Sequence, residues 1–149
     1  MEDKIIEKLI KAEKKRQKET INLIASENFV STDILEALGS ELTNKYSEGY
    51  SGKRYYPGNI YYDEIEEIAK FRALKVFGLS KDDWSVNVQP YSGSPANFEI
   101  YSALLLPGEK FMGMALNSGG HLTHGHRVSH TGKFWKTIHY KTSENGWIN

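Results

Sequence analysis

The residues best suited to chemistry form a short turn, Ser92-Gly93-Ser94. Val86 and Val88 alternate with polar neighbours just before it, which predicts a short strand. Ser94 suits an N-cap and Pro95 suits the first helical position, so a strand, a turn and a helix are expected in that order. Free helix N–H groups, two hydroxyls and a glycine could bind a phosphate. An ordinary capped turn explains the same residues.

The helix that follows this turn should place four apolar residues on one face: Phe98, Tyr101, Leu104 and Leu105. Pro107-Gly108 should end it. The sequence contains neither GxGxxG nor GxxxxGK[ST], so neither a dinucleotide-binding turn nor a P-loop is indicated.

The histidines form the second group with chemical potential, since all five lie between His121 and His139. The spacing of four of them could suit a metal: His121, His124, His126 and His130. Glu144 is the single carboxylate between Leu116 and Asn149, however, and catalytic zinc sites commonly use an acid. We therefore predict no metal site. The alternative is a histidine ring that packs on an aromatic cofactor.

Helices and strands that would position these residues can be read from hydrophobic periodicity. Helices are expected over residues 2–19 and 62–77, and a short helix capped by Ser31 should bury Ile34, Leu35, Leu38 and Leu42. The apolar face of the 62–77 helix should comprise Ile65, Ile68, Ala69, Arg72, Ala73 and Val76. Residues 110–116 and 135–140 read as strands. Residues 43–60 read as a tyrosine- and glycine-rich loop, a length that is often functional.

The composition limits the classes of protein to which the chain can belong. The chain has 149 residues, with 19 basic and 19 acidic side chains, so its charge balance gives no reason to expect a nucleic acid partner. It has no cysteine, which excludes disulfides and thiolate metal sites and fits a cytoplasmic protein. The longest aliphatic run is Ala103–Leu106, so no membrane span is predicted.

Five motifs in this order resemble serine hydroxymethyltransferase: LIASEN (23–28), LTNKYSEGY (42–50), GKRYY (52–56), NVQPYSGSPAN (87–97) and GGHLTHG (119–125). The resemblance implies an α/β fold of the aspartate-aminotransferase type (fold type I) that binds pyridoxal 5'-phosphate. It also implies interconversion of serine and glycine, with transfer of a one-carbon unit to tetrahydrofolate.

The resemblance assigns cofactor contacts to individual residues. Ser92, Gly93 and Ser94 would hold the cofactor phosphate, and His121 would stack on the pyridine ring. Tyr46 would reach the phosphate from a neighbouring subunit, which implies a homodimer or homotetramer.

The resemblance also assigns substrate contacts. Ser26 would contact the substrate carboxylate, and Glu48 would handle protons near the serine hydroxyl and folate. Tyr56 would face the substrate from the same side as Glu48. The folate-binding positions would be Leu116, Gly120, His121 and Leu122. Glu48, His121 and Tyr56 are thus the predicted catalytic residues.

The family's chains are far longer than this one. The resemblance implies that residues 1–45 are an N-terminal arm with helices and that residues 46–149 begin the large cofactor-binding domain. The lysine that binds the cofactor covalently, the aspartate that pairs with the pyridine nitrogen and the arginine that binds the substrate carboxylate would lie beyond Asn149. We therefore expect the chain to be inactive alone. The alternative is a non-catalytic remnant or interaction module that keeps part of the fold.

Overall fold

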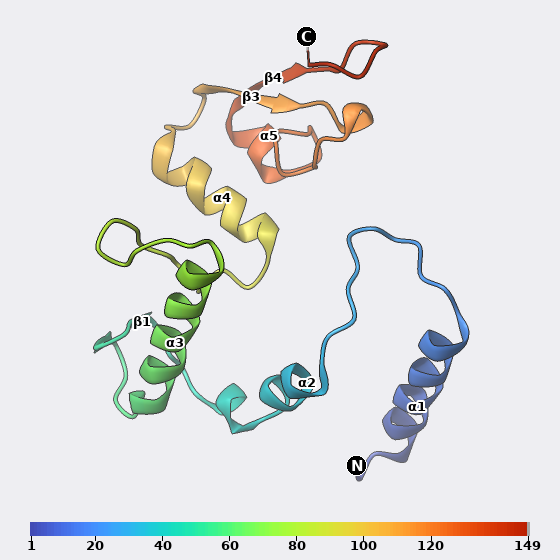
Figure 1. Cartoon of the computed structure of the whole chain (residues 1–149), viewed down its shortest axis with the longest axis vertical. Coiled ribbons are helices and arrows are strands. Elements are labelled where there is room, and N and C mark those ends of the chain that lie inside the picture. The colour runs from blue at the N-terminus through green and yellow to red at the C-terminus, as the bar shows by residue number, and fades with distance from the viewer. Residues whose placement is uncertain (149) are drawn as a thin grey trace. The chain divides into compact units, whose positions relative to one another are not determined.

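The computed structural model describes residues 1–148; Asn149, the last residue of the second predicted segment, lies outside them. The chain divides into two compact units, residues 1–48 and 49–149, which are described separately. Figure 1 shows the elements of both.

The first unit holds α1 (Lys4–Glu19), α2 (Thr32–Leu38) and the 3-10 helix η1 (Glu41–Asn44). Asp3 caps α1 by accepting bonds from two first-turn N–H groups, and the Ser31 hydroxyl accepts the Ile34 N–H at the start of α2. The helix predicted over residues 2–19 and the cap at Ser31 are confirmed.

The inward apolar face predicted for the second helix is wrong for the described chain. Its four residues are exposed, from 36% for Leu42 to 67% for Leu38; Ile34 and Leu35 lie between these values. Helical periodicity marks a face that must be covered, but within residues 1–48 few elements are available to cover it.

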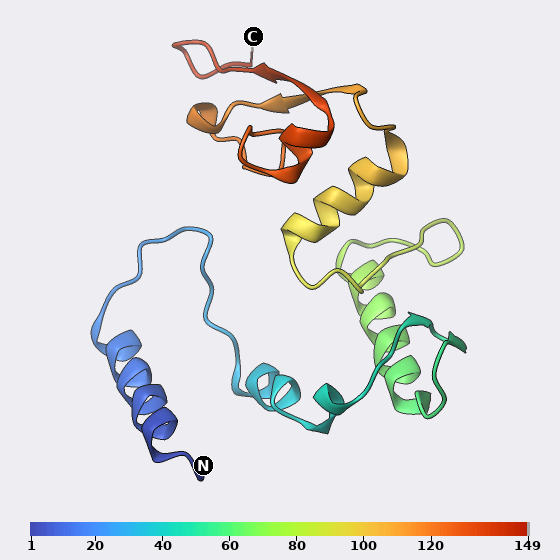
Figure 2. The ribbon, with the colours of Figure 1, turned by 180° about the vertical axis from the view of Figure 1, so that it is seen from behind.

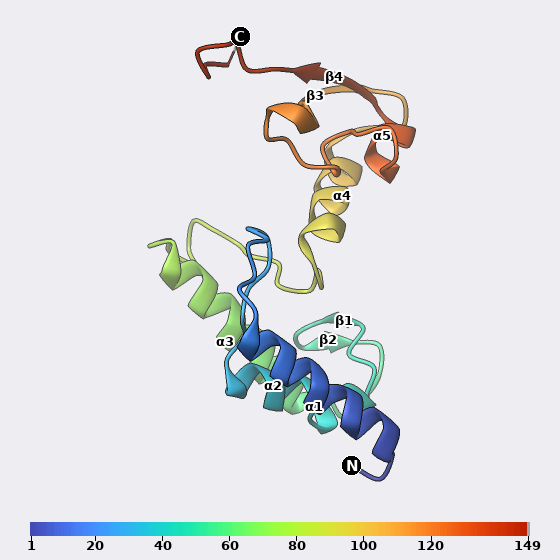
Figure 3. The same cartoon turned by 90° about the vertical axis from the view of Figure 1, so that its right-hand side faces the viewer.

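The second unit begins with a hairpin that the sequence reading missed. β1 (Gly49–Tyr50) pairs antiparallel with β2 (Lys53–Arg54), and both precede α3 (Ile60–Val76). β1 lies beside α3 in Figure 1, and Figure 3 labels both strands of the hairpin. Gly49 has φ +96°, and a Cβ there would lie 2.5 Å from the Lys53 carbonyl oxygen, so the hairpin needs glycine at this position.

α3 confirms the predicted third helix, although it begins two residues earlier, and Gly78 follows its end with φ +66°. Much of its predicted apolar face is left uncovered: Ile65, Ile68 and Val76 are exposed, whereas Leu74 is the buried residue of the helix.

The remainder of the second unit is a βα arrangement around a small aromatic core. α4 (Gly93–Leu104) leads to β3 (Lys110–Met114) and η2 (Leu116–Ser118), then α5 (His130–Phe134) and β4 (Lys136–Tyr140). β3 and β4 pair in parallel, from Lys110↔Lys136 to Met114↔Tyr140. They lie side by side in Figures 1 and 2. Both predicted strands are confirmed, and the structure is mixed α/β.

Trp135 lies at the centre of this core and is 6% exposed. Its ring packs on Phe98 and Tyr101 of α4, with centroids 5.6 and 5.9 Å away, and Tyr101 packs on Phe111 of β3 at 4.3 Å. These contacts confirm the inward role of Phe98 and Tyr101, but Leu104 is 76% exposed. The aromatic rings thus fix α4 against the β3–β4 pair.

Two predictions at the start of α4 are wrong. Residues 86–89 form no strand, because no described strand lies beside them; the Asn87 side chain accepts the Gln89 N–H instead. The helix begins at Gly93 with Ser92 as N-cap, so Pro95 is the third helical residue. Proline is tolerated there because first-turn N–H groups lack intrahelical partners in any case.

None of the helices in the described residues combines the length and apolar character that a membrane crossing requires.

Candidate functional site

The N-terminus of α4 carries the donors expected of a phosphate site. Ser92 is extended (φ −163°, ψ 167°) and its hydroxyl makes no capping bond to the helix. A Cβ placed on Gly93 would meet no atom within 4 Å, so the space beside this glycine is open. Two serine hydroxyls and the first-turn N–H groups of Gly93 and Ser94 stand at the positive end of the helix dipole. This donor set fits a phosphate dianion.

The turn after β3 fixes the backbone of His121. The Gly120 N–H donates to the Ala115 carbonyl at 3.0 Å, and Gly119 has φ +99°. A Cβ on Gly120 would lie 2.0 Å from the Met114 carbonyl oxygen. Only glycine permits this close approach, so the turn holds His121 directly beyond the end of β3.

Hydrogen bonds between polar side chains connect this turn to α4. Asn97 Nδ2 donates to Thr123 Oγ1 at 2.8 Å, and Thr123 Oγ1 lies 2.7 Å from His121 Nδ1. The Tyr101 hydroxyl lies 2.8 Å from His124 Nδ1, and burial raises the pKa of this tyrosine. The structure therefore joins the helix that begins at Ser92–Ser94 to the loop that carries His121.

A cavity of about 480 Å³ lies between these two segments. Its walls include Ser94, Phe98, Leu122, Thr123 and His130. Ser94 and Leu122, predicted as phosphate and folate contacts, thus share one cavity. Leu116 instead lines a separate depression of about 530 Å³ with Asn117, His126, His139 and Lys141.

The histidines predicted not to form a metal site act as hydrogen-bonding and aromatic residues in the structure. No group of three or more histidine, aspartate or glutamate side chains within residues 1–148 is arranged to hold a metal ion. His130 packs edge-on against Phe98 with centroids 6.3 Å apart.

Four predicted site residues belong to segments other than α4 and the loop that carries His121. Ser26, Tyr46 and Glu48 belong to the unit 1–48, where Ser26 lies in a turn closed by the Glu27 N–H and the Ile24 carbonyl. Glu48 is exposed and Tyr46 is 70% exposed. Tyr56, in the second unit, is 45% exposed. The roles of these four residues stay predictions.

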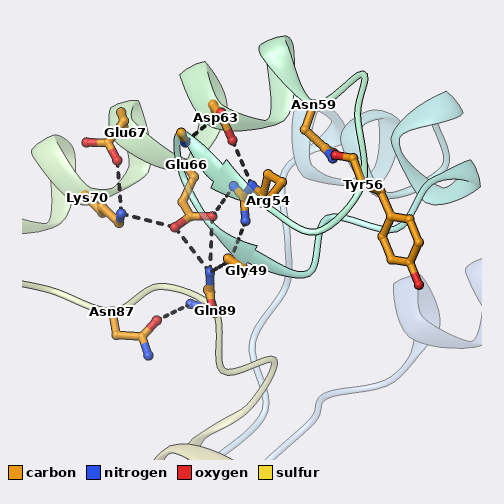
Figure 4. A network of polar contacts seen from close by, with 11 residues as sticks. Gly49, Arg54, Tyr56, Asn59, Asp63, Glu66, Glu67, Lys70, Asn87 and Gln89 are labelled. Carbon is orange, nitrogen blue, oxygen red and sulfur yellow. Dashed lines mark hydrogen bonds and ion pairs between the residues drawn. The ribbon is translucent and has the colours of Figure 1, made fainter.

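The sequence reading missed a buried ionic network between the hairpin and α3 (Figure 4). The Arg54 side chain is 5% exposed; its Nε contacts Asp63 Oδ1 at 2.8 Å and its Nη2 contacts Glu66 Oε2 at 2.6 Å. Its Nη1 donates to the Gly49 carbonyl at 2.8 Å, as does Gln89 Nε2. Arg54 thus joins β2, α3 and the residue directly after Glu48. The signal was present in the sequence as two acids one helical turn apart, Asp63 and Glu66, soon after an arginine.

The pKa values around Arg54 are consistent with a fully ionised network. The Gly52 N–H and then Arg54 hold the pKa of Asp63 below its usual value. Desolvation would raise the pKa of Glu66, but bonds from Arg54, Lys70 and Gln89 outweigh it and leave that pKa lowered. The same carboxylates raise the pKa of Arg54.

Asn59 supports Tyr56 from within the same hairpin-to-helix segment. Asn59 is 4% exposed, and its Nδ2 donates to the Tyr56 carbonyl at 2.8 Å. The Tyr56 ring points away from the ionic network in Figure 4. This hydrogen bond therefore anchors the backbone of Tyr56.

Comparison with known proteins decides the family. The family model described as serine hydroxymethyltransferase matches residues 1–149. The chain belongs to the serine hydroxymethyltransferase family. A serine hydroxymethyltransferase of Metamycoplasma arthritidis is 54% identical over 146 residues, covering 98% of this chain and 34% of the relative. One of Desulfotalea psychrophila is 56% identical over 145 residues, covering 97% and 33%.

A cytosolic serine hydroxymethyltransferase of Encephalitozoon cuniculi is 51% identical over 154 aligned positions, covering 100% of this chain and 34% of the relative. The chain spans about a third of the length of the curated serine hydroxymethyltransferases that it matches.

Proposed function

We propose that this chain forms the N-terminal portion of a pyridoxal-phosphate-dependent serine hydroxymethyltransferase. The enzyme interconverts serine and glycine and passes a one-carbon unit to tetrahydrofolate. The observation that carries the proposal is the family match over all 149 residues. The parallel β3–β4 pair and its covering helices are consistent with the start of an aspartate-aminotransferase-like domain.

The cofactor is held at the N-terminus of α4 in this proposal. Ser92, Gly93 and Ser94 bind its phosphate with hydroxyl and N–H donors, and the helix dipole favours the negative charge. His121 stacks on the pyridine ring. When bound, pyridoxal phosphate supplies an electron sink for the negative charge that develops on the substrate.

The remaining residues bind and orient the substrates. Ser26 binds the amino acid carboxylate, and Tyr56 faces the substrate from its anchored backbone. Leu116, Gly120 and Leu122 contact folate together with His121. The supporting observation is that Leu122 shares a cavity with Ser94, next to the proposed phosphate site.

Glu48 holds or releases the proton at the serine hydroxyl. A carboxyl group does this well when its surroundings shift its pKa toward the working pH. Glu48 is exposed in the described chain, so residues of another chain or segment must bury its carboxyl group. We propose that a neighbouring subunit of a homodimer or homotetramer provides it, with Tyr46 reaching that subunit's cofactor phosphate. We also propose a cytoplasmic location, in line with the name of the E. cuniculi relative.

Two substitutions in the full-length enzyme that contains this segment separate these roles. Glu48→Gln keeps the shape but removes the titrating proton, so we expect turnover to fall about a hundred- to ten-thousand-fold with cofactor occupancy unchanged. Ser94→Ala removes a hydroxyl from the phosphate site, so we expect cofactor loss first.

Serine turnover and the visible absorbance of the bound cofactor are measured for both variants. Near-normal turnover of Glu48→Gln would contradict the role given to Glu48. Equal loss of cofactor in both variants would contradict the assignment of the phosphate site to α4. A full-length protein that binds the cofactor but does not turn over serine would be a non-catalytic remnant.

A further inference from the structure

The contacts of Thr123 determine which nitrogen of His121 carries the proton. Thr123 is 8% exposed, and its oxygen accepts a hydrogen bond from Asn97 Nδ2 at 2.8 Å. Its own hydroxyl hydrogen then points to His121 Nδ1 at 2.7 Å. The Thr123 backbone N–H, which can only donate, also points to Nδ1 at 3.2 Å. Nδ1 therefore accepts, and the ring proton lies on Nε2.

The Thr123 hydroxyl is not the only group that sets the direction of the hydrogen bond to His121. The reverse direction would need a proton on Nδ1, which the backbone N–H of Thr123 would face at hydrogen-bond distance. Two donors that face each other are unfavourable. The backbone N–H of Thr123 therefore fixes the direction of the hydrogen bonds from Asn97 to Thr123 and from Thr123 to His121, which together are called the relay.

The relay also sets the spacing between two elements of the proposed cofactor site. Asn97 lies one helical turn after Ser94, and Tyr101 lies one further turn along α4. The two side chains bind Thr123 and His124, respectively. A rigid helix therefore connects the N-terminus of α4 to the loop that carries His121.

We propose that Asn97 and Thr123 are positioning residues that fix the ring plane and the Nε2–H tautomer of His121. Their hydrogen bonds hold this ring at a set distance from Ser92–Ser94. The proposal rests on the proposed function in one respect, the stacking of His121 on the cofactor ring; the tautomer itself does not depend on it.

The first experiment compares Thr123→Val with Thr123→Ser in the full-length holoenzyme. Valine keeps the shape but has no hydroxyl, so we expect about two- to tenfold faster loss of pyridoxal phosphate on dialysis, as for one lost hydrogen bond. The visible circular dichroism of the cofactor should change, because the ring beside it is reoriented. Serine keeps the hydroxyl and should restore both readouts. Asn97→Asp, which cannot donate to Thr123, should resemble valine.

The second experiment reads the tautomer without the cofactor. The full-length apoenzyme is labelled with ¹⁵N-histidine and studied by NMR at mildly alkaline pH, with His121→Gln assigning the signal. We expect a protonated Nε2 and an unprotonated Nδ1 in the unsubstituted enzyme. Thr123→Val should keep this tautomer, because its backbone N–H still donates to Nδ1.

The outcomes separate the two proposals. A proton on Nδ1 would overturn the relay. Wild-type cofactor retention and circular dichroism in Thr123→Val would overturn the positioning role, as would a Thr123→Ser variant that behaves like valine. An unsubstituted enzyme with the expected tautomer but no cofactor binding would contradict the proposed function and leave the relay intact.

Discussion

Arg54→Met should open the hairpin without removing any predicted catalytic residue. The methionine keeps much of the apolar stem but has no donors. The change removes the contacts to Asp63 and Glu66 and the bond from Nη1 to the Gly49 carbonyl. Because Gly49 directly follows Glu48, the hairpin holds the backbone at the residue next to Glu48.

The size of the effect follows from the burial of Arg54 and Glu66, whose side chains are 5% and 11% exposed. Removing one partner of a buried ion pair costs about 3–5 kcal/mol, since the other charge stays buried. Lys70 remains 3.1 Å from Glu66 and compensates part of its charge. We therefore expect the lower end for Arg54→Met, about 3 kcal/mol, or roughly a hundredfold in a local opening equilibrium.

Amide hydrogen exchange of peptides covering residues 49–59 in the full-length enzyme measures this opening directly. Arg16→Met is the matched control, because Arg16 contacts Glu13 at 2.7 Å on an exposed face of α1. Exposed ion pairs contribute little, so exchange of α1 should hardly change. Unaltered exchange at 49–59 in Arg54→Met, or an equal effect in the control, would refute the role given to the buried network.

The pH dependence gives a second check. The pKa values of Asp63 and Glu66 are lowered in the folded chain, so their pairing stabilises it above their usual values and is lost as pH falls through the lowered ones. The difference between Arg54→Met and the unsubstituted enzyme should therefore be full at neutral pH and shrink below about pH 4. A difference that grows on acidification would contradict this sign.

Two further predictions concern exposed surface and the Gly119-Gly120 turn. A polypeptide of the 149 residues alone should bind the dye ANS and melt without a sharp transition, because Ile21, Leu23 and Phe77 are each more than three-quarters exposed; a cooperative melt of a monomer with dispersed amide signals would count against this. Gly120→Ala in the full-length enzyme should lower cofactor retention, because its Cβ would lie 2.0 Å from the Met114 carbonyl oxygen. The control Gly39→Ala, whose Cβ would lie 3.4 Å from its nearest atom, should retain the cofactor. Equal retention in both variants would refute the close-approach argument.

Local signals predicted most of the secondary structure. The cap at Ser31, the helix ended by Gly78 and the two apolar strands are each determined by neighbouring residues, so periodicity and capping rules were sufficient. The hairpin at 49–54 was missed because its strands are only two residues long and carry no alternation.

Predictions from the sequence failed where contacts with other segments of the chain determine the local structure. Residues 86–89 alternate like a strand, but a strand needs a neighbour, and Gln89 bonds to Gly49 instead. The apolar faces of α2 and α3 were recognised, but whether a face is buried depends on what lies against it. In the candidate site, the motif at Ser92–Ser94 was found, whereas the bond of Asn97 to Thr123 joins residues too distant in sequence for any local pattern. The bonds of Arg54 to α3 were missed although an arginine followed by two acids one turn apart was a local signal for them.

Serine-to-glycine turnover in the presence of pyridoxal phosphate and tetrahydrofolate tests the central claim most directly. The full-length protein that contains this segment is measured beside a polypeptide of the 149 residues alone. We predict turnover that requires both additions for the full-length protein, and none above a protein-free blank for the 149 residues. Absence of turnover in the full-length protein, or turnover by the 149 residues alone, would contradict the proposed function.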